Sequence, residues 1–270
     1  MSRIWLSAAC LLLVGCAAQP SVVAPSVSSS TSISATPLIV LDSGHNPADG
    51  GAISVLGSKE ISYNDRFVAE LAPALRAAGW RVILTRQPGE SLSLVERARM
   101  TDDLQASLFL SIHHDSVQLR CLRQVTREGR IAFETRRPMG GYSLYVSKEN
   151  PDFTRSYRFA TMLGEQLHAL GRSPMLEHAG TACGESRPLL DARLGIYQYD
   201  HLAVLRHNKV PAILLEVGVI TDLQDELYVN NLANRSKMIA GIVRAADMWV
   251  RSEPVRQQPR GTSSVSDWNL

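Results

Sequence analysis

Two hydrophobic patterns alternate along most of this chain. Runs rich in apolar residues, typical of buried strands in a parallel sheet, occupy residues 38–41, 80–84, 107–112, 142–146 and 212–216. Apolar residues at helical spacing predict helices at 61–78, 93–104 and 156–170, and a last helix marked by Ile239, Ile242, Val243, Ala246 and Val250. Strands separated by helices predict the α/β fold class: a single domain with a mostly parallel twisted sheet and helices on both faces.

Local signals mark several helix ends. Ser93 and Glu96 have the spacing of a capping box, in which each side chain binds the backbone of the other. Gly79 and Gly171 follow two of the predicted helices. Because glycine readily adopts the left-handed conformation, both are natural helix stops.

The first 16 residues resemble a bacterial lipoprotein signal peptide. A short basic start precedes an apolar run, residues 4–14, which is shorter than the roughly 20 residues that a membrane-spanning helix needs. The run ends in Leu13-Val14-Gly15-Cys16, which is similar to the lipobox. This resemblance implies cleavage before Cys16 and lipid attachment to it. The alternative is an ordinary signal peptide in which Cys16 is incidental.

The residues after the lipobox predict sorting and domain limits. Ala17 and Ala18 follow without an aspartate, which resembles outer-membrane cargo and predicts a lipid-anchored, periplasm-facing protein of the cell envelope. Residues 17–37 are uncharged and rich in Ser, Pro and Ala, which predicts a flexible tether. Residues 252–270 are polar and predict a disordered tail. The folded domain is therefore expected at 38–251.

Composition narrows the range of partners. Apolar residues make up 45% of the chain and charged residues 20%, as is ordinary for a soluble globular domain. The formal charge is only +2 and there is no Lys/Arg run, so nucleic acid is not expected as a partner. No internal repeat or second domain is visible, and a monomer is expected.

Two cysteines are expected to remain in the mature folded domain. Cys10 leaves with the signal peptide and Cys16 carries lipid, which leaves Cys121 and Cys183 in an oxidising compartment. We predict that these two form a disulfide. Two separate loop thiols are the alternative, because sequence does not supply the geometry that a disulfide requires.

Four ionisable residues are expected to meet at one edge of the sheet. His45 follows the first strand, His113 follows another, Glu216 ends the last strand, and Glu60 begins the first helix. The carboxyl ends of parallel strands share an edge, where α/β proteins hold their chemistry. Two imidazoles and one carboxylate form a common zinc site, and a second carboxylate can serve as a base. Each residue also has a structural explanation, although a buried carboxylate such as Glu216 is costly without a partner.

The same stretches carry a family resemblance, in order along residues 38–250. They read LIVLDSGHNPADGGAISVLGSKE, VILTRQ with LSLVERARM, SLFLSIHHDS, and VPAILLEVGVITDLQDE. Together they resemble the zinc-dependent N-acetylmuramoyl-L-alanine amidases, which hydrolyse the amide between N-acetylmuramic acid and L-alanine in peptidoglycan. The resemblance implies that the domain at 38–251 is the catalytic domain of a cell-wall hydrolase, with peptidoglycan as its partner.

The resemblance also implies a role for each matching residue. His45, Glu60 and His113 match the family's zinc ligands, one Zn²⁺ per chain, and Glu216 matches its catalytic glutamate. Arg86 matches an arginine after the second strand and is expected to be structural or to orient substrate. Water activated at the zinc would open the amide, with the glutamate as proton carrier.

Several positions depart from the family pattern. Ser43 and Asn46 replace a proline and a glycine. His114 and Asp115 stand where alanine and asparagine are usual, which doubles the histidines. Because neighbouring side chains on a strand face opposite ways, both histidines cannot reach one metal, and the motif register favours His113. His114 and Asp115 are then candidates for substrate contact or for orienting a histidine.

Two long segments lie outside the stretches that carry the family resemblance. Residues 117–141 are basic and are expected to shape or cover a substrate groove, and 172–201 reads as a loop that contacts substrate or has no role. The remaining histidines are expected to be surface or structural residues: His168, His178, His201 and His207.

Three alternatives remain open. Two histidines and a carboxylate also suit non-haem iron. The fold could serve as a non-catalytic peptidoglycan-binding lipoprotein, although a binder needs no ligand set and no base. An amidase silenced by residues 117–141 until an activator protein acts is the third.

Overall fold

The computed structural model describes Met1 and residues 36–127 and 129–253. The predicted signal peptide at 1–16 with Cys16, almost all of the tether at 17–37, and the tail beyond residue 253 lie outside the described residues. Within the described part, no helix is long and apolar enough to cross a membrane.

The domain alternates strands and helices. The main sheet contains β1 (Leu38–Ser43), β2 (Arg81–Leu84), β3 (Leu108–Asp115), β6 (Ser143–Val146), β7 (Leu189–Asp191), β8 (Ile196–Gln198) and β9 (Ala212–Val219). The helices are α1 (Glu60–Ala77), α2 (Leu94–Asp103), α3 (Phe153–Ala169), α4 (Ala203–Arg206), α5 (Leu223–Asn230) and α6 (Leu232–Ser252), with 3-10 turns η1 (Leu119–Cys121) and η2 (Glu177–Ala179). A separate hairpin comprises β4 (Leu122–Arg127) and β5 (Arg130–Thr135).

The main sheet is mixed but mostly parallel. Its strand order is β2-β1-β3-β9-β6-β8-β7. The first four strands pair in parallel, whereas β6 runs antiparallel to β9 and β7 antiparallel to β8. The carboxyl ends of β1, β3 and β9 therefore meet at one edge, as the α/β prediction requires.

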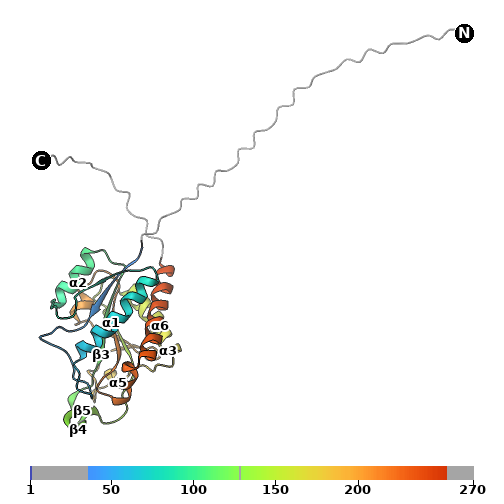
Figure 1. Cartoon of the computed structure of the whole chain (residues 1–270). Coiled ribbons are helices and arrows are strands. Elements are labelled where there is room, and N and C mark those ends of the chain that lie inside the picture. The colour runs from blue at the N-terminus through green and yellow to red at the C-terminus, as the bar shows by residue number, and fades with distance from the viewer. Residues whose placement is uncertain (2–35, 128, 254–270) are drawn as a thin grey trace, which may run out of the picture. The chain divides into compact units, whose positions relative to one another are not determined.

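Helices cover both faces of this sheet, also as predicted. On one face, α1, α3 and α6 bury the larger core, which contains Phe67, Phe159 and Trp249. Figure 1 shows α1, α3 and α6 together at the front and right of the sheet, with α2 at its left edge. The opposite face has a smaller core with Phe109 and Tyr145, closed in part by α4.

Helix ends follow the predicted local chemistry in part. The capping box is present: Ser93 Oγ accepts a hydrogen bond from the amide of Glu96, whose carboxylate accepts one from the amide of Ser93. Helix α5 was not predicted, although Asp222 caps it by accepting a hydrogen bond from the amide of Asp225.

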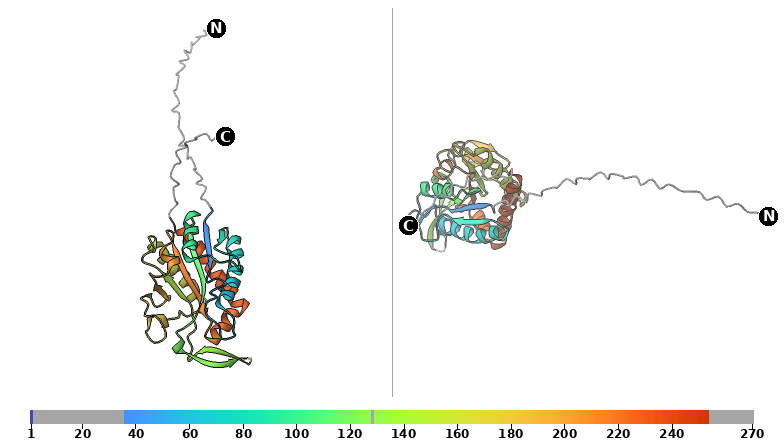
Figure 2. Two further views of the ribbon diagram at one scale, coloured as in Figure 1. Left: turned by 90° about the vertical axis from the view of Figure 1, so that its left-hand side faces the viewer. Right: turned by 90° about the horizontal axis from the view of Figure 1, so that it is seen from above.

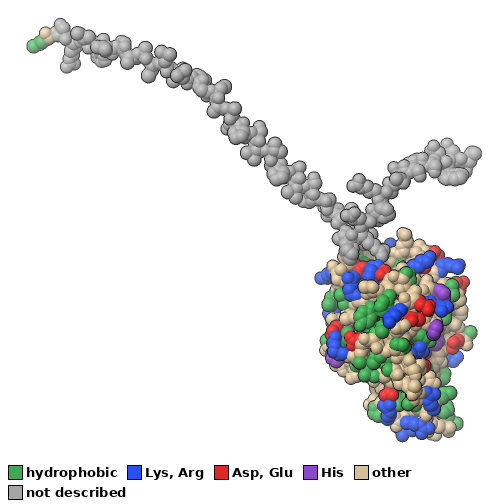
Figure 3. All heavy atoms as spheres, turned by 180° about the vertical axis from the view of Figure 1, so that it is seen from behind, with side chains coloured by type: hydrophobic (Ala, Val, Ile, Leu, Met, Phe, Trp, Pro, Cys, Tyr) green, Lys and Arg blue, Asp and Glu red, His purple; other side chains and the backbone are tan. Residues whose placement is uncertain are grey.

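The basic segment at residues 117–141 contains a β-hairpin. Strands β4 and β5 pair through six residues each, from Leu122 opposite Thr135 to Arg127 opposite Arg130. The hairpin follows the carboxyl end of β3 and projects from the lower end of the domain in Figure 2. Basic and apolar side chains gather at this end of the domain in Figure 3. Among the apolar residues of the hairpin, Ile131 and Phe133 are exposed.

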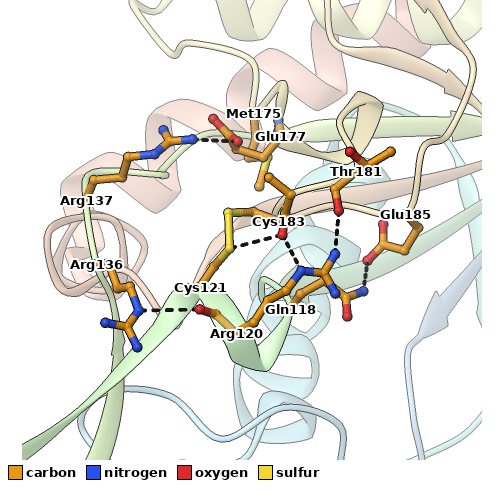
Figure 4. The surroundings of a disulfide bond; sticks show 11 residues. Gln118, Arg120, Cys121, Arg136, Arg137, Met175, Glu177, Thr181, Cys183 and Glu185 are labelled. Atoms are coloured by element: carbon orange, nitrogen blue, oxygen red, sulfur yellow. Dashed lines mark hydrogen bonds and ion pairs between the residues drawn. A yellow bond between two sulfur atoms is a disulfide. The ribbon is translucent and has the colours of Figure 1, made fainter.

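The expectation of a loop over residues 172–201 is wrong at its end, where β7 and β8 extend the sheet beyond β6. The middle of this segment, at residues 181–185, is bonded to the base of the hairpin. Cys121 and Cys183 form a disulfide, and Arg120 donates hydrogen bonds to the carbonyls of Thr181 and Ala182. Figure 4 shows these bonds and the hydrogen bond from Gln118 to Glu185. The two segments are therefore joined by a covalent bond and by several hydrogen bonds.

Candidate metal centre

Three candidate ligands lie together at the carboxyl edge of the sheet. His45 Nε2 lies 2.9 Å from one carboxylate oxygen of Glu60, and His113 Nδ1 lies 3.1 Å from the other. One ligand atom from each residue lies within 4.8 Å of the others. The two imidazole side chains keep 23% and 18% exposure with the hairpin in place. The cluster is therefore reachable from solvent.

Two glycines allow this close approach. A Cβ on Gly44 would lie 2.3 Å from the ring of His113. A Cβ on Gly51 would lie 2.4 Å from the carboxylate of Glu60 and 2.7 Å from His45 Nε2, and its φ of +73° also favours glycine. At these two positions of the loop between β1 and α1, any larger residue would overlap a candidate ligand side chain.

His45 is held in an unusual backbone conformation. Its φ is +66°, in the left-handed region that non-glycine residues seldom occupy. Its carbonyl accepts hydrogen bonds from Arg86 Nε at 3.1 Å and from Arg97 at 2.5 Å. Arg86 also donates to the backbone of Ser43 and pairs with Asp65 at 2.7 Å. Of the two roles expected for Arg86, the contacts fit the structural one.

The neighbouring histidines point to opposite faces of β3. His113 joins Glu60, whereas the ring of His114 packs against Tyr63 and Phe67 and contacts Asn64 Oδ1 at 2.8 Å. Burial lowers the pKa of His114 to about 3, so its ring is neutral at physiological pH. The structure thus places His114 in the core beside α1, away from the candidate centre.

Glu216 lies beside the ligands. It is the register partner of His113 across β3 and β9. Its Oε2 is buried and accepts no hydrogen bond from any described residue. Burial, followed by the negative charges of Asp115 and Glu60, raises the pKa of the Glu216 carboxyl well above its ordinary value. A carboxyl whose proton is held more tightly than usual can act as a general acid as well as a general base.

Asp115 contacts a histidine outside the metal cluster. His178, from the segment after α3, is buried and lies 2.5 Å from Asp115 Oδ2 and 2.9 Å from Glu185 Oε2. Burial would lower the pKa of His178, but the charges and hydrogen bonds of the two carboxylates raise it to about 10. His178 is therefore a charged structural residue, and Asp115 orients it.

This ion pair predicts a pH dependence of stability. His178 has a folded-state pKa above the usual unfolded value of about 6.5, so its stabilising effect is complete below that pH and is lost as pH rises toward 10. We expect His178→Gln to lower the melting temperature at pH 6, by an amount that shrinks at pH 9.5. Thermal unfolding across this range tests it, with exposed His168→Gln as control. A constant difference would contradict the ion-pair assignment.

Two further residues support the centre, although neither was among the site residues predicted from the sequence. Arg97 on α2 binds Asp42, the carbonyl of Ser43 and that of His45 while almost fully buried. Asn64, one turn into α1 from Glu60, donates to the Glu60 carboxylate at 3.2 Å. An arginine inside an amphipathic helix and an asparagine one turn after a carboxylate were the available signals.

An α/β domain with a His/Glu/His cluster at the carboxyl edge of parallel strands is typical of metal-dependent hydrolases. The family model described as N-acetylmuramoyl-L-alanine amidase matches residues 39–247. The chain belongs to this family.

Similar proteins are consistent with this assignment. The protein named "Probable cell wall amidase LytH" from Staphylococcus epidermidis is 27% identical over 218 residues, which is 78% of this chain and 59% of that protein. The chain thus spans less than two thirds of that relative. The amidase Ami1 from Mycobacterium smegmatis has the same fold, with a TM-score of 0.62 and 21% identity over 82% of this chain and 99% of that one. The CwlD amidase of Clostridioides difficile, whose structure was solved in complex with the GerS lipoprotein, has a TM-score of 0.60 and 17% sequence identity. The match covers 80% of this chain and 100% of that one.

Proposed function

We propose that this protein hydrolyses the amide bond between N-acetylmuramic acid and the L-alanine of peptidoglycan stem peptides, with zinc held by His45, Glu60 and His113. The observation that carries the proposal is the convergence of these three ligand atoms within 4.8 Å beside Glu216, whose Oε2 has no hydrogen-bond partner among the described residues. Family membership supports the choice of bond.

The residues fit a catalytic zinc ion. Two imidazole nitrogens and a carboxylate oxygen are a common protein set for such sites, and partial exposure of both imidazoles leaves room for a further ligand. Asn64 and the amide of Ala52 donate to the Glu60 carboxylate and orient it. Zinc bound there would supply a Lewis acid that polarises the amide carbonyl and promotes deprotonation of water.

Glu216 carries the proton in this reaction. Its carboxylate accepts a proton from the attacking water, whose oxygen forms a bond to the amide carbon. Its raised pKa makes the protonated form accessible, so it can then deliver that proton to the nitrogen as the C–N bond breaks. The products are the free lactyl carboxylate and the amine of L-alanine.

We also propose the cellular setting from the sequence. A lipid on Cys16 would tether the domain in the cell envelope, facing the periplasm and attached to the outer membrane, where peptidoglycan is its substrate. Such an enzyme would act in wall remodelling or daughter-cell separation, as a monomer, with any activator protein still to be identified. Wall binding without catalysis is the competing function, and it gives no use to Glu216.

Digestion of purified peptidoglycan sacculi tests the proposal. We expect the protein to release free stem peptides, EDTA to abolish release, and stoichiometric Zn²⁺ to restore it. Metal analysis of the purified protein distinguishes zinc from iron. Binding to sacculi without peptide release by the zinc-loaded protein would instead favour the non-catalytic wall protein.

A further inference from the structure

An arginine outside the family motifs lies on the same face of the sheet as Glu216. The guanidinium carbon of Arg187 lies 3.4 Å from the centre of the Tyr199 ring and 6.0 Å from that of Tyr145. Its side chain is 20% exposed. Stacking on aromatic rings fixes the plane of a guanidinium and leaves its edge free to bind a planar group.

Strand register places Arg187 near the candidate catalytic carboxylate. Tyr145 on β6 is the partner of Leu214 on β9, and Ser143 is the partner of Glu216. Because side chains two residues apart share a face, Tyr145 and Glu216 lie on the same side of neighbouring strands. The positive charge of Arg187 also acts on Glu216, where it opposes the rise in pKa that burial causes.

The guanidinium has unused hydrogen-bonding capacity. Arginine has five N–H donors on this group, yet Arg187 donates no side-chain hydrogen bond to any residue that the structure describes. Its one acidic neighbour is Glu185, with Oε2 3.4 Å from Nε. That carboxylate already accepts hydrogen bonds from His178 and Gln118. The terminal nitrogens of Arg187 therefore remain available for a ligand.

The backbone around Arg187 is held in place. Its amide donates a 2.8 Å hydrogen bond to the carbonyl of His178, whose ring is fixed between Asp115 and Glu185. The Cys121–Cys183 disulfide joins the same segment to the base of the hairpin, as Figure 4 shows. A donor fixed in this way loses little conformational entropy when it binds.

We propose that Arg187 binds a carboxylate of the peptide part of the substrate and positions the scissile amide against Glu216. This inference rests on the proposed amidase function. In the substrate, the lactyl carboxyl is consumed by the amide, so the negative charges near the bond belong to the peptide. A guanidinium edge binds a carboxylate through two parallel hydrogen bonds, which a neutral amide cannot replace.

Kinetics on two muramoyl peptides test this role, one with free carboxylates and one with the same groups amidated. For Arg187→Gln we expect kcat/KM on the first substrate to fall about 10- to 100-fold, the effect of losing a charged hydrogen bond. Most of the change should appear in KM. On the amidated substrate, Arg187→Gln and the wild type should be similar. Arg187→Lys should recover part of the loss.

The controls separate this inference from the proposed function. Arg193→Gln alters an exposed arginine that pairs with Glu165, and should behave as wild type. Zinc content and melting temperature should be unchanged in Arg187→Lys. Equal losses on both substrates, or a wild-type enzyme indifferent to amidation, would overturn carboxylate binding while leaving the amidase intact. A wild type that cleaves neither peptide would overturn both.

Discussion

Replacing Glu216 with glutamine is expected to lower kcat/KM for peptidoglycan by about 10³-fold, the middle of the range for loss of a positioned acid–base group. Glutamine keeps the size of the side chain but can neither accept the proton of the attacking water nor deliver it to the amide nitrogen. The metal ligands are unchanged, so bound zinc should stay at one ion per chain. Release of stem peptides measures the first effect and metal analysis the second.

The same substitution should not destabilise the fold. Glu216 has a buried oxygen without a hydrogen-bond donor among the described residues, and an isolated buried carboxylate is costly. A neutral amide removes that cost, so the melting temperature of Glu216→Gln should equal or exceed that of the wild type. Catalytic groups often lower the stability of the folded protein, and replacing them then stabilises it. Glu165→Gln, at an exposed acid on α3, is the matched control. Near-normal peptide release by Glu216→Gln would rule out the proposed proton carrier.

The main sheet and the placement of the site residues could be predicted because both follow from short-range patterns. An apolar run buried on both faces reads clearly as a parallel strand, and the first polar residue after it must lie at the sheet edge. His113 and Glu216 directly follow the apolar runs of β3 and β9, and His45 lies two residues after the end of β1. Convergence of residues far apart in sequence is then a consequence of topology.

The added strands had weaker signals. Strands β7 and β8 have three residues each, too few to show a period. In the hairpin, one face carries apolar and uncharged polar residues and the other mixes apolar and charged ones, and the apolar side chains do not follow burial: Ile131 and Phe133 are exposed while Ala132 between them is buried. Binary patterning therefore did not distinguish this hairpin from a basic loop.

The supporting residues could not be found from local sequence at all. Arg97 binds a carbonyl 52 residues away, and His178 binds a carboxylate 63 residues away. Their roles exist only after the segments that carry them have packed, in the case of His178 beside a disulfide. The same holds for Arg187, whose surroundings come from three separate segments.

The adjacent histidines of β3 give a prediction with two opposite outcomes. His113→Ala removes one of three ligands and should leave the purified protein nearly free of zinc, with kcat/KM at least about 10³-fold lower, since the metal supplies several kcal/mol of charge stabilisation. His114→Ala should keep its zinc, because that ring lies in the core beside α1. It should instead lower the free energy of unfolding by about 2–4 kcal/mol, through a cavity and an unsatisfied Asn64.

Zinc content by metal analysis and stability by denaturant unfolding separate these outcomes, with exposed His201→Ala as control. Both proteins must be compared without added metal, because zinc binding itself stabilises the folded state. If His114→Ala lost zinc while His113→Ala kept it, the metal site would lie on the α1 face and the proposed ligand set would be wrong.

Loss of zinc in both variants would mean that the packing of His114 governs the position of His113 and Glu60. The two are linked through the backbone, because the amide of His114 donates to the Glu60 carboxylate at 3.2 Å. In that case His114→Asn, which preserves a polar contact to Asn64, should restore metal binding.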